Sequence, residues 1–195
     1  MLNKITKTLG QLVESAASVV GIRTVEEPDY RCEKLTKHVQ IRHYGPRVAA
    51  ETIVGSDEMS ARNEGFRRLA GFIFGRNHGG DRIAMTAPVA AASAESGWVI
   101  RFYMPAERTL ATLPMPDDDR VRLVEVPAES VAVLRFTGTA TPEAVAAQTA
   151  ALRHALQAYG FETVGSPVTW LYDPPWTIPW RRRNEVAIGV TPVCV

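Results

Sequence analysis

The chain has 195 residues, of which 46% are hydrophobic and 22% are charged. This composition is that of an ordinary globular domain, so extensive disorder is excluded. The 22 basic and 21 acidic residues leave a net charge of +1, which argues against a nucleic-acid-binding protein with a dominant basic field. The two cysteines, Cys32 and Cys194, form no CxxC pair, so the sequence predicts neither a zinc ribbon nor a disulfide scaffold.

Residues 1–25 predict an amphipathic helix, because apolar residues recur there at helical spacing. Polar residues interrupt the apolar run that a secretory signal peptide would need. We therefore expect a cytoplasmic protein. In this interpretation the N-terminal helix is an extension that packs on the body or makes weak membrane contact, and residues 26–195 form the domain.

The first half of the domain predicts a broken strand, a helix and two further strands. Strands are indicated by runs rich in β-branched and apolar residues, and the helix by apolar spacing of three and four. In chain order the elements are a strand at 39–54 with a break at Gly45-Pro46, a helix at 57–74, strands at 82–90 and 98–104, and a proline-rich acidic linker at 105–120.

The second half predicts the same elements in the same order, about 82 to 86 residues later. They are a strand pair at 121–136 with a break at Pro127, a helix at 141–159, and strands at 168–172 and 185–190. A constant offset between whole units suggests duplication. We expect an α+β domain with two pseudo-symmetric repeats, about 39–104 and 121–192, that share one mixed or antiparallel sheet.

The predicted helix 57–74 has an apolar face that is interrupted by two polar residues. The apolar members of this face are Met59, Phe66, Leu69, Ala70 and Ile73. Arg62 and Asn63 lie within it, and unpaired polar groups are costly to bury. Either Arg62 extends to the edge of a buried face, with the glycines of the helix allowing close packing, or this face lines a cleft for an apolar ligand with a polar end.

Common catalytic signatures are missing from the sequence: it holds no GxSxG, HExxH or P-loop motif, and no GxGxxG that opens a helix. His38 and His43 are an odd number of residues apart, so on one strand they face opposite sides and cannot share a metal. His43 shares its strand face with Val39 and Ile41. Such a residue is either a hydrogen-bonded core histidine or a ligand, and neutral imidazole is a good axial ligand for haem iron in an apolar pocket.

The segment 172–185 is rich in proline and tryptophan and continues into three consecutive arginines, 181–183. One interpretation is a rigid hairpin whose arginines pair with acidic residues such as Asp117 to Asp119. The other is a lip over a flat aromatic ligand, with an arginine for its carboxylates.

Six segments, in this order and spacing, resemble the SOUL haem-binding protein family. They are IRHYGPRVAAET (41–52), GFRRLAGFIFGRN (65–77), IAMTAPV (83–89), RFYMP (101–105), VAVLRFTG (131–138) and YDPPW…RRNEV (172–186). The resemblance covers about residues 30–190. It implies two βαββ repeats that form a distorted antiparallel or mixed β-barrel flanked by two helices. It also implies that haem or another tetrapyrrole binds reversibly, without turnover, in an apolar cleft beside the first helix under the 172–185 loop.

The resemblance also implies roles for individual residues. His43 matches a histidine proposed as axial iron ligand in some members, and Arg62 or Arg181 would face the haem propionates. The expected porphyrin contacts are Asn63, Phe66, Ala70 and Trp176. The expected cofactor is haem or another tetrapyrrole, the expected oligomeric state is a monomer, and no nucleic-acid partner is expected.

Two other classes of function stay open at this point. One is a tetrapyrrole-modifying enzyme that removes the metal or opens the ring, although the sequence offers no acid–base constellation for it. The other is an interaction protein whose cleft binds a partner helix, a membrane or another flat hydrophobic molecule. The double-repeat fold also resembles effector-binding domains of bacterial drug-responsive regulators, which favours the last of these ligands.

Overall fold

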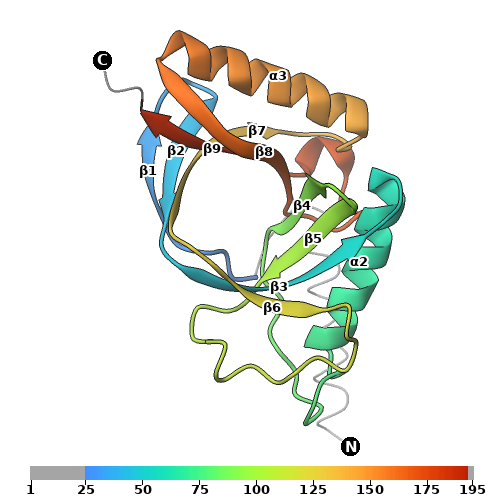
Figure 1. The fold of residues 1–195 in the computed structure, drawn as a ribbon. Coiled ribbons are helices and arrows are strands. Elements are labelled where there is room, and N and C mark those ends of the chain that lie inside the picture. The colour runs from blue at the N-terminus through green and yellow to red at the C-terminus, as the bar shows by residue number, and fades with distance from the viewer. Residues whose placement is uncertain (1–24, 193–195) are drawn as a thin grey trace, which may run out of the picture.

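The computed structural model describes residues 25–192, so the helix predicted at the N-terminus lies outside the described residues. The described part contains nine strands, two α-helices and a short 3-10 helix (Figure 1). They are β1 (Tyr30–Lys34), β2 (Val39–Tyr44), β3 (Arg47–Val54), α2 (Glu58–Ile73), β4 (Val89–Ala94), β5 (Gly97–Tyr103), β6 (Arg122–Val126), β7 (Glu129–Phe136), α3 (Pro142–Ala158), β8 (Phe161–Leu171), η1 (Pro179–Arg181) and β9 (Asn184–Pro192).

Both predicted helices are confirmed, with ends within a residue of the expected ones. The Asp57 side chain caps α2 by accepting a hydrogen bond from the Ser60 amide, and the Thr141 side chain caps α3 in the same way. Pro142 suits the first turn of α3, where its missing N–H costs nothing.

The nine strands form one antiparallel sheet in the order β1-β2-β7-β9-β8-β4-β5-β3-β6. The sheet curls strongly (Figure 1), but its edge strands β1 and β6 do not pair with each other. The expected distorted barrel is therefore wrong. Of the two kinds of sheet that were expected, the antiparallel one is confirmed and the mixed one is wrong, and the α+β class is confirmed. At Gly45-Pro46 the chain passes from β2, which pairs with β7, into β3, which pairs with β6, and a proline cannot donate to a ladder at that break.

The strand order has an internal symmetry. Exchanging β2 with β6, β3 with β7, β4 with β8 and β5 with β9 gives the order of these eight strands in reverse. Each helix follows two strands and precedes two more, so the unit is ββαββ rather than the expected βαββ. The duplication itself stays a prediction.

Three strands differ from the sequence expectation, and one of them, β8, begins at Phe161 instead of at residue 168. The strand expected at 82–90 begins only at Val89, because 82–88 form a connection in which Ile83 is buried in the cluster under α2 and Ala87 in the cluster on the concave face. Within this connection the Ile83 amide donates to the Ile73 carbonyl rather than to a strand. β1 was not expected at all, since all of its side chains are exposed and show no alternation.

The two helices pack on the outer face of the curled sheet, each over its own apolar cluster (Figure 1). Leu69 and Phe72 of α2 pack with Ile100 of β5, and Leu152 of α3 packs with Ile188 of β9. A third cluster with several aromatic residues occupies the concave face. It includes Tyr44, Tyr103, Trp170 and Tyr172.

Gly65 brings α2 very close to the sheet. A Cβ atom at this position would lie 2.4 Å from Cγ1 of Ile100. The helix therefore presses this side against β5, and its buried residues are Ala61, Arg62, Gly65, Leu69, Phe72 and Ile73. Met59 and Phe66 remain 44% and 39% exposed, so the expectation that they share the buried face is wrong.

Gly65→Ala is expected to lower the free energy of unfolding by about 1 to 3 kcal/mol, because the added methyl group overlaps Ile100. Gly71→Ala on the same helix is the matched control, since its Cβ would meet only the flexible side chain of Arg76, at 3.2 Å. That variant gains helix propensity and should be neutral or more stable by up to about 1 kcal/mol. Urea denaturation of both variants measures the difference, and equal midpoints would contradict the close packing.

Candidate functional site

The outer side of α2 carries a stripe of residues that spans most of the helix. Met59, Asn63, Phe66 and Ala70 are spaced by four, three and four residues, so they lie one above the other along one side. Ala70 is half-buried and the other three are exposed. The Phe66 ring contacts Phe102 of β5 edge-on, with ring centroids 5.3 Å apart. Three of the predicted porphyrin contacts, Asn63, Phe66 and Ala70, are thus brought together on this α2 stripe.

Arg62 lies beside the stripe, and its Nη1 is 3.9 Å from Sδ of Met59. It is 9% exposed, and its guanidinium donates to the Ala140 carbonyl at 2.6 Å and pairs with Glu58. Burial lowers the pKa of Arg62, and the neighbouring Glu58 carboxylate opposes this effect. The guanidinium therefore ties the start of α2 to the loop before α3, and in this position it serves the fold.

Residues 172–183 between β8 and β9 form an ordered loop, here called the tail loop. Arg182 donates from Nε to the Thr177 carbonyl at 2.7 Å and from Nη2 to the Pro175 carbonyl at 2.5 Å. The backbone N–H of Arg183 donates to Oδ2 of Asp173 at 2.6 Å. Arg182 and Arg183 thus close the loop from within and do not take Asp117 to Asp119 as partners, contrary to one sequence interpretation.

The tail loop and the start of α2 are joined through a single short segment, 138–140. The Gly138 amide donates to the Pro179 carbonyl at 2.9 Å, while Ala140 accepts from Arg62. Figure 1 shows the tail loop beside the end of α2 where the helix begins. On this loop, which lies beside the start of α2, Trp176 is 63% exposed and Trp180 is 72% exposed.

His43 lies elsewhere, on β2 between β1 and β7. Its Nδ1 is 2.8 Å from Oγ of Ser130 and its Nε2 is 3.3 Å from Oε1 of Glu33. It shares the outer face with Val39 and Ile41, which belong to the cluster under α3. None of these contacts is to α2, so the structure does not bring His43 together with the α2 stripe.

A buried carboxylate on the concave face was not anticipated from the sequence. Glu185 is 0% exposed and accepts hydrogen bonds from Arg42 at 2.7 and 2.9 Å, from the Tyr172 hydroxyl at 2.8 Å and from Nε of Arg183 at 2.9 Å. Burial alone would raise the pKa of Glu185. The hydrogen bond and charge of Arg42, together with Arg183 and Tyr172, bring that pKa below its ordinary value.

This Glu185 network fixes both ends of the tail loop. Tyr172 begins the loop and Arg183 ends it, and the Arg183 guanidinium also lies 3.6 Å from the centroid of the Tyr172 ring. Arg183 further pairs with Glu27 at 2.9 Å, which holds the start of the described chain. The signal in the sequence was the presence of charged residues inside two otherwise apolar strands, at Arg42 and Glu185.

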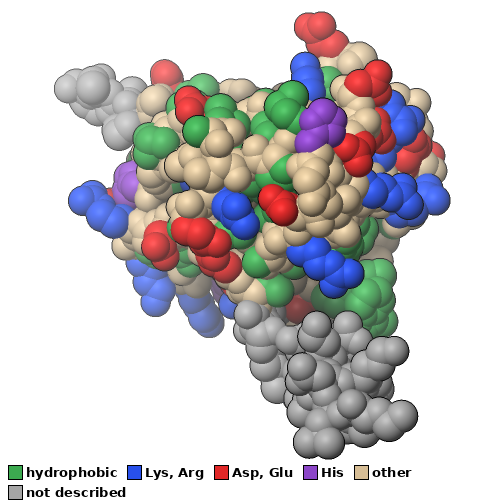
Figure 2. Space-filling model, turned by 90° about the horizontal axis from the view of Figure 1, so that it is seen from below, with side chains coloured by type: hydrophobic (Ala, Val, Ile, Leu, Met, Phe, Trp, Pro, Cys, Tyr) green, Lys and Arg blue, Asp and Glu red, His purple; other side chains and the backbone are tan. Residues whose placement is uncertain are grey.

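Figure 2 shows basic and acidic side chains interspersed on one face, without a field of one sign. Within residues 25–192, no three histidine, cysteine, aspartate or glutamate side chains gather as a metal site. No helix among those residues is long and apolar enough to cross a membrane.

The fold and the site define a class of protein: an α+β domain that presents an apolar helix stripe and an ordered aromatic loop on one side. Residues 25–189 match the family model described as SOUL heme-binding protein, and the chain belongs to this family.

Curated relatives agree with this assignment, and a solved structure shares the fold. Heme-binding protein 1 of Sus scrofa is 32% identical over 151 residues, which cover 73% of this chain and 78% of that protein. Heme-binding protein 2 of Mus musculus is 32% identical over 162 residues and 75% of each chain. The crystal structure of the EcmrR C-terminal domain superposes with a TM-score of 0.61 over 84% of this chain and 99% of that one, at 10% identity, which shows a shared fold.

Glu185→Gln is expected to destabilise the protein by about 3 to 5 kcal/mol, because it leaves two buried guanidinium groups without their full counter-charge. Glu33→Gln, on the exposed strand β1, is the control and should leave stability unchanged. Chemical denaturation at neutral pH measures both variants. A loss that is no larger for Glu185→Gln than for the control would contradict the role of the network.

The pH dependence of stability gives a second test of the same carboxylate. Because folding lowers the pKa of Glu185 below its ordinary value of 4.5, its contribution is present above that value and is lost as the pH falls through the lowered pKa. Wild type should therefore lose stability between about pH 5 and pH 3 more steeply than Glu185→Gln. Parallel slopes in denaturation curves over this range would overturn the expectation.

Proposed function

We propose that this protein binds haem or another tetrapyrrole on the side formed by the α2 stripe and the tail loop, and that it carries the ligand without changing it. The observation that carries the proposal is the exposure of Phe66, Trp176 and Trp180 on this side, in a chain of the SOUL heme-binding family. Exposed aromatic groups that gather on one side commonly mark a binding surface.

The residues present fit a tetrapyrrole. A porphyrin is a flat apolar ring system with carboxylates at one edge, and aromatic side chains contribute both apolar area and stacking geometry to such a ligand. Phe66 stands on a rigid base, since it packs against Phe102, and the tail loop is held by internal hydrogen bonds. Bound haem would supply its iron centre and a strong visible absorption.

Two arginines are the candidates for the propionates. Arg67 is exposed on α2 next to Phe66, and its Nε is 3.4 Å from the Asn63 carbonyl, so it follows the stripe. Arg181 is exposed on the tail loop. Arg62, the other residue expected from the family resemblance, is engaged by Glu58 and Ala140 and is a weaker candidate. An arginine pairs well with a carboxylate because its planar fork can donate two parallel hydrogen bonds.

The role of His43 as an iron ligand stays a prediction. Its position on the α3 side of the sheet favours a porphyrin held on the α2 stripe by apolar and stacking contacts. The cytoplasmic location, the monomeric state and the absence of turnover also stay predictions, and recovery of unchanged haem after incubation with a reductant tests the last of these.

Phe66→Ala and Trp176→Ala are each expected to weaken hemin binding about ten-fold, since each removes an aromatic contact with the ring. Tyr159→Ala is the matched control, because Tyr159 is 55% exposed at the end of the other helix, α3. Titrations followed in the Soret region measure the affinities. If wild type shows no saturable band, the proposed function is wrong; if the three variants bind alike, the ligand lies on another surface.

His43→Ala is expected to leave the position and height of the Soret band unchanged, because His43 contacts Ser130 and Glu33 rather than the α2 stripe. The measurement is the hemin spectrum of this variant beside that of wild type. A shifted or weakened band would instead support His43 as the axial ligand and would place the porphyrin on the α3 side.

A further inference from the structure

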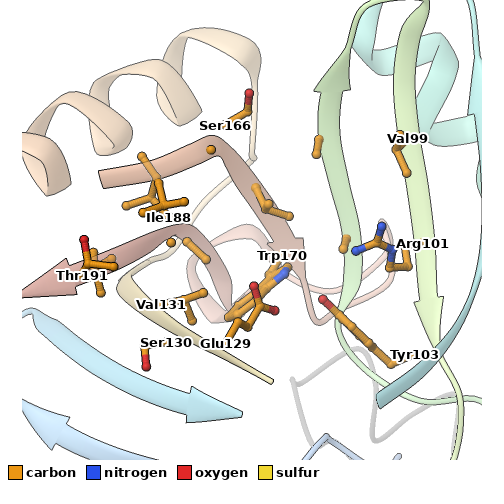
Figure 3. A pocket seen from close by; sticks show the side chains of 18 residues that line it. Val99, Arg101, Tyr103, Glu129, Ser130, Val131, Ser166, Trp170, Ile188 and Thr191 are labelled. Carbon is orange, nitrogen blue, oxygen red and sulfur yellow. The ribbon is translucent and has the colours of Figure 1, made fainter. Parts of the chain in front are cut away.

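A cavity of about 430 Å³ lies on the concave face of the sheet, away from the helices (Figure 3). Its walls come from β4, β5, β7, β8 and β9, and neither the α2 stripe nor the tail loop contributes to it. A volume of this size is within the range of small-molecule sites, whose walls are mostly apolar with a few polar groups that orient the ligand.

The cavity exists because β4 is built from small residues. Ala90 and Ala92 alternate with Ala91, so the first two face the cavity and the third faces the cluster under α2. Across the concave face the wall includes the branched side chains of Val131 and Val168. Protein interiors are normally close-packed. The two alanines point to the same side of β4, and their small side chains leave a void there that larger residues would fill.

The cavity wall also contains a polar group without a partner. Trp170 is 2% exposed, and within the part of the chain that the structure describes its Nε1 makes no hydrogen bond of normal distance and angle. The Tyr103 hydroxyl lies beside it, and Trp170 opposes the rise that burial gives the pKa of Tyr103. Its ring is held by Tyr44, edge-on at 5.7 Å between centroids. Figure 3 shows the indole nitrogen and the Tyr103 hydroxyl directed into the same space beside the cavity. Buried donors are nearly always paired, so the free indole N–H points to an acceptor supplied from outside.

The charged residues of the wall are neutralised by the protein itself. Arg101 pairs with Glu51 at 2.7 Å, and Glu129 pairs with Arg47. An ionic ligand would have to displace one partner of these ion pairs. An uncharged ligand with a hydrogen-bond acceptor can instead bind the indole N–H of Trp170. This favours a neutral ligand over an anion or a cation.

We propose that this cavity is a second binding site, which takes a small uncharged aromatic molecule whose carbonyl oxygen accepts a hydrogen bond from Nε1 of Trp170. The alanines of β4 provide room for the ring, and the indole N–H orients the carbonyl. The site is independent of the surface proposed for the tetrapyrrole and stands whether or not that proposal holds.

The experiment compares two probes by isothermal titration calorimetry: 2-acetylnaphthalene, which has the carbonyl, and 2-ethylnaphthalene, which has nearly the same shape without it. Wild type should bind the ketone about five-fold more tightly than the hydrocarbon, the preference expected for one neutral hydrogen bond. Absence of saturable binding of the ketone would overturn the proposal. Equal affinities would overturn the role of Trp170.

Three variants locate the site. Ala92→Phe fills the cavity from a half-buried position and should abolish ketone binding, whereas Phe66→Ala on the α2 stripe should leave it unchanged. Trp170→Phe keeps a ring but removes the N–H, so it should bind both probes equally. Circular dichroism checks that each variant is folded, and if Trp170→Phe is not, Ala92→Phe and the probe pair still decide. Ketone binding that survives Ala92→Phe, or that is lost in Phe66→Ala, would overturn the proposal.

Discussion

Glu185 stands in the middle of the curled sheet, without access to solvent, and accepts hydrogen bonds from Arg42, Arg183 and Tyr172. These partners come from β2 and from both ends of the tail loop. A buried carboxylate requires such partners, since an unpaired charge in this place would be strongly destabilising. The position of the tail loop, and with it the orientation of the exposed indoles, therefore depends on one ionic network inside the sheet.

The segments that resemble the family contain two kinds of residue: buried residues of the Glu185 network and residues exposed at the surface. Arg42, Tyr172, Arg183 and Glu185 are buried or nearly so and hold the sheet and the loop together. Phe66 and Trp176 are exposed, at 39% and 63%. Segments that identify a family thus combine residues that maintain the fold with residues available to a ligand, and burial tells them apart.

Local signals in the sequence were enough to predict the two helices, since capping residues such as Asp57 and Thr141 act on their own neighbours. Features of the structure that depend on contacts between residues far apart in the sequence could not be predicted. The face of α2 that is buried is set by the contact of Gly65 with Ile100 on β5. The hydrogen-bond partner of Arg62 is a carbonyl in the loop before α3. The strand β1 has no hydrophobic pattern that would reveal it. Of the candidate site, Asn63, Phe66 and Ala70 were correctly placed together by helical spacing, whereas nothing local indicated that His43 lies apart from them.

Small residues decide where this protein leaves room for ligands. On the outer face of β5, Gly65 lets α2 approach until Ile100 is in contact with the helix backbone, so no ring system fits between α2 and the sheet. A tetrapyrrole at α2 must therefore lie against the outer stripe and the tail loop. On the inner face of β4, Ala90 and Ala92 have the opposite effect, because their small side chains leave a cavity beside them. The neighbouring strands β4 and β5 thus have a closed outer face and a hollow inner face, and a flat tetrapyrrole and a compact aromatic molecule would meet different sides of the same sheet.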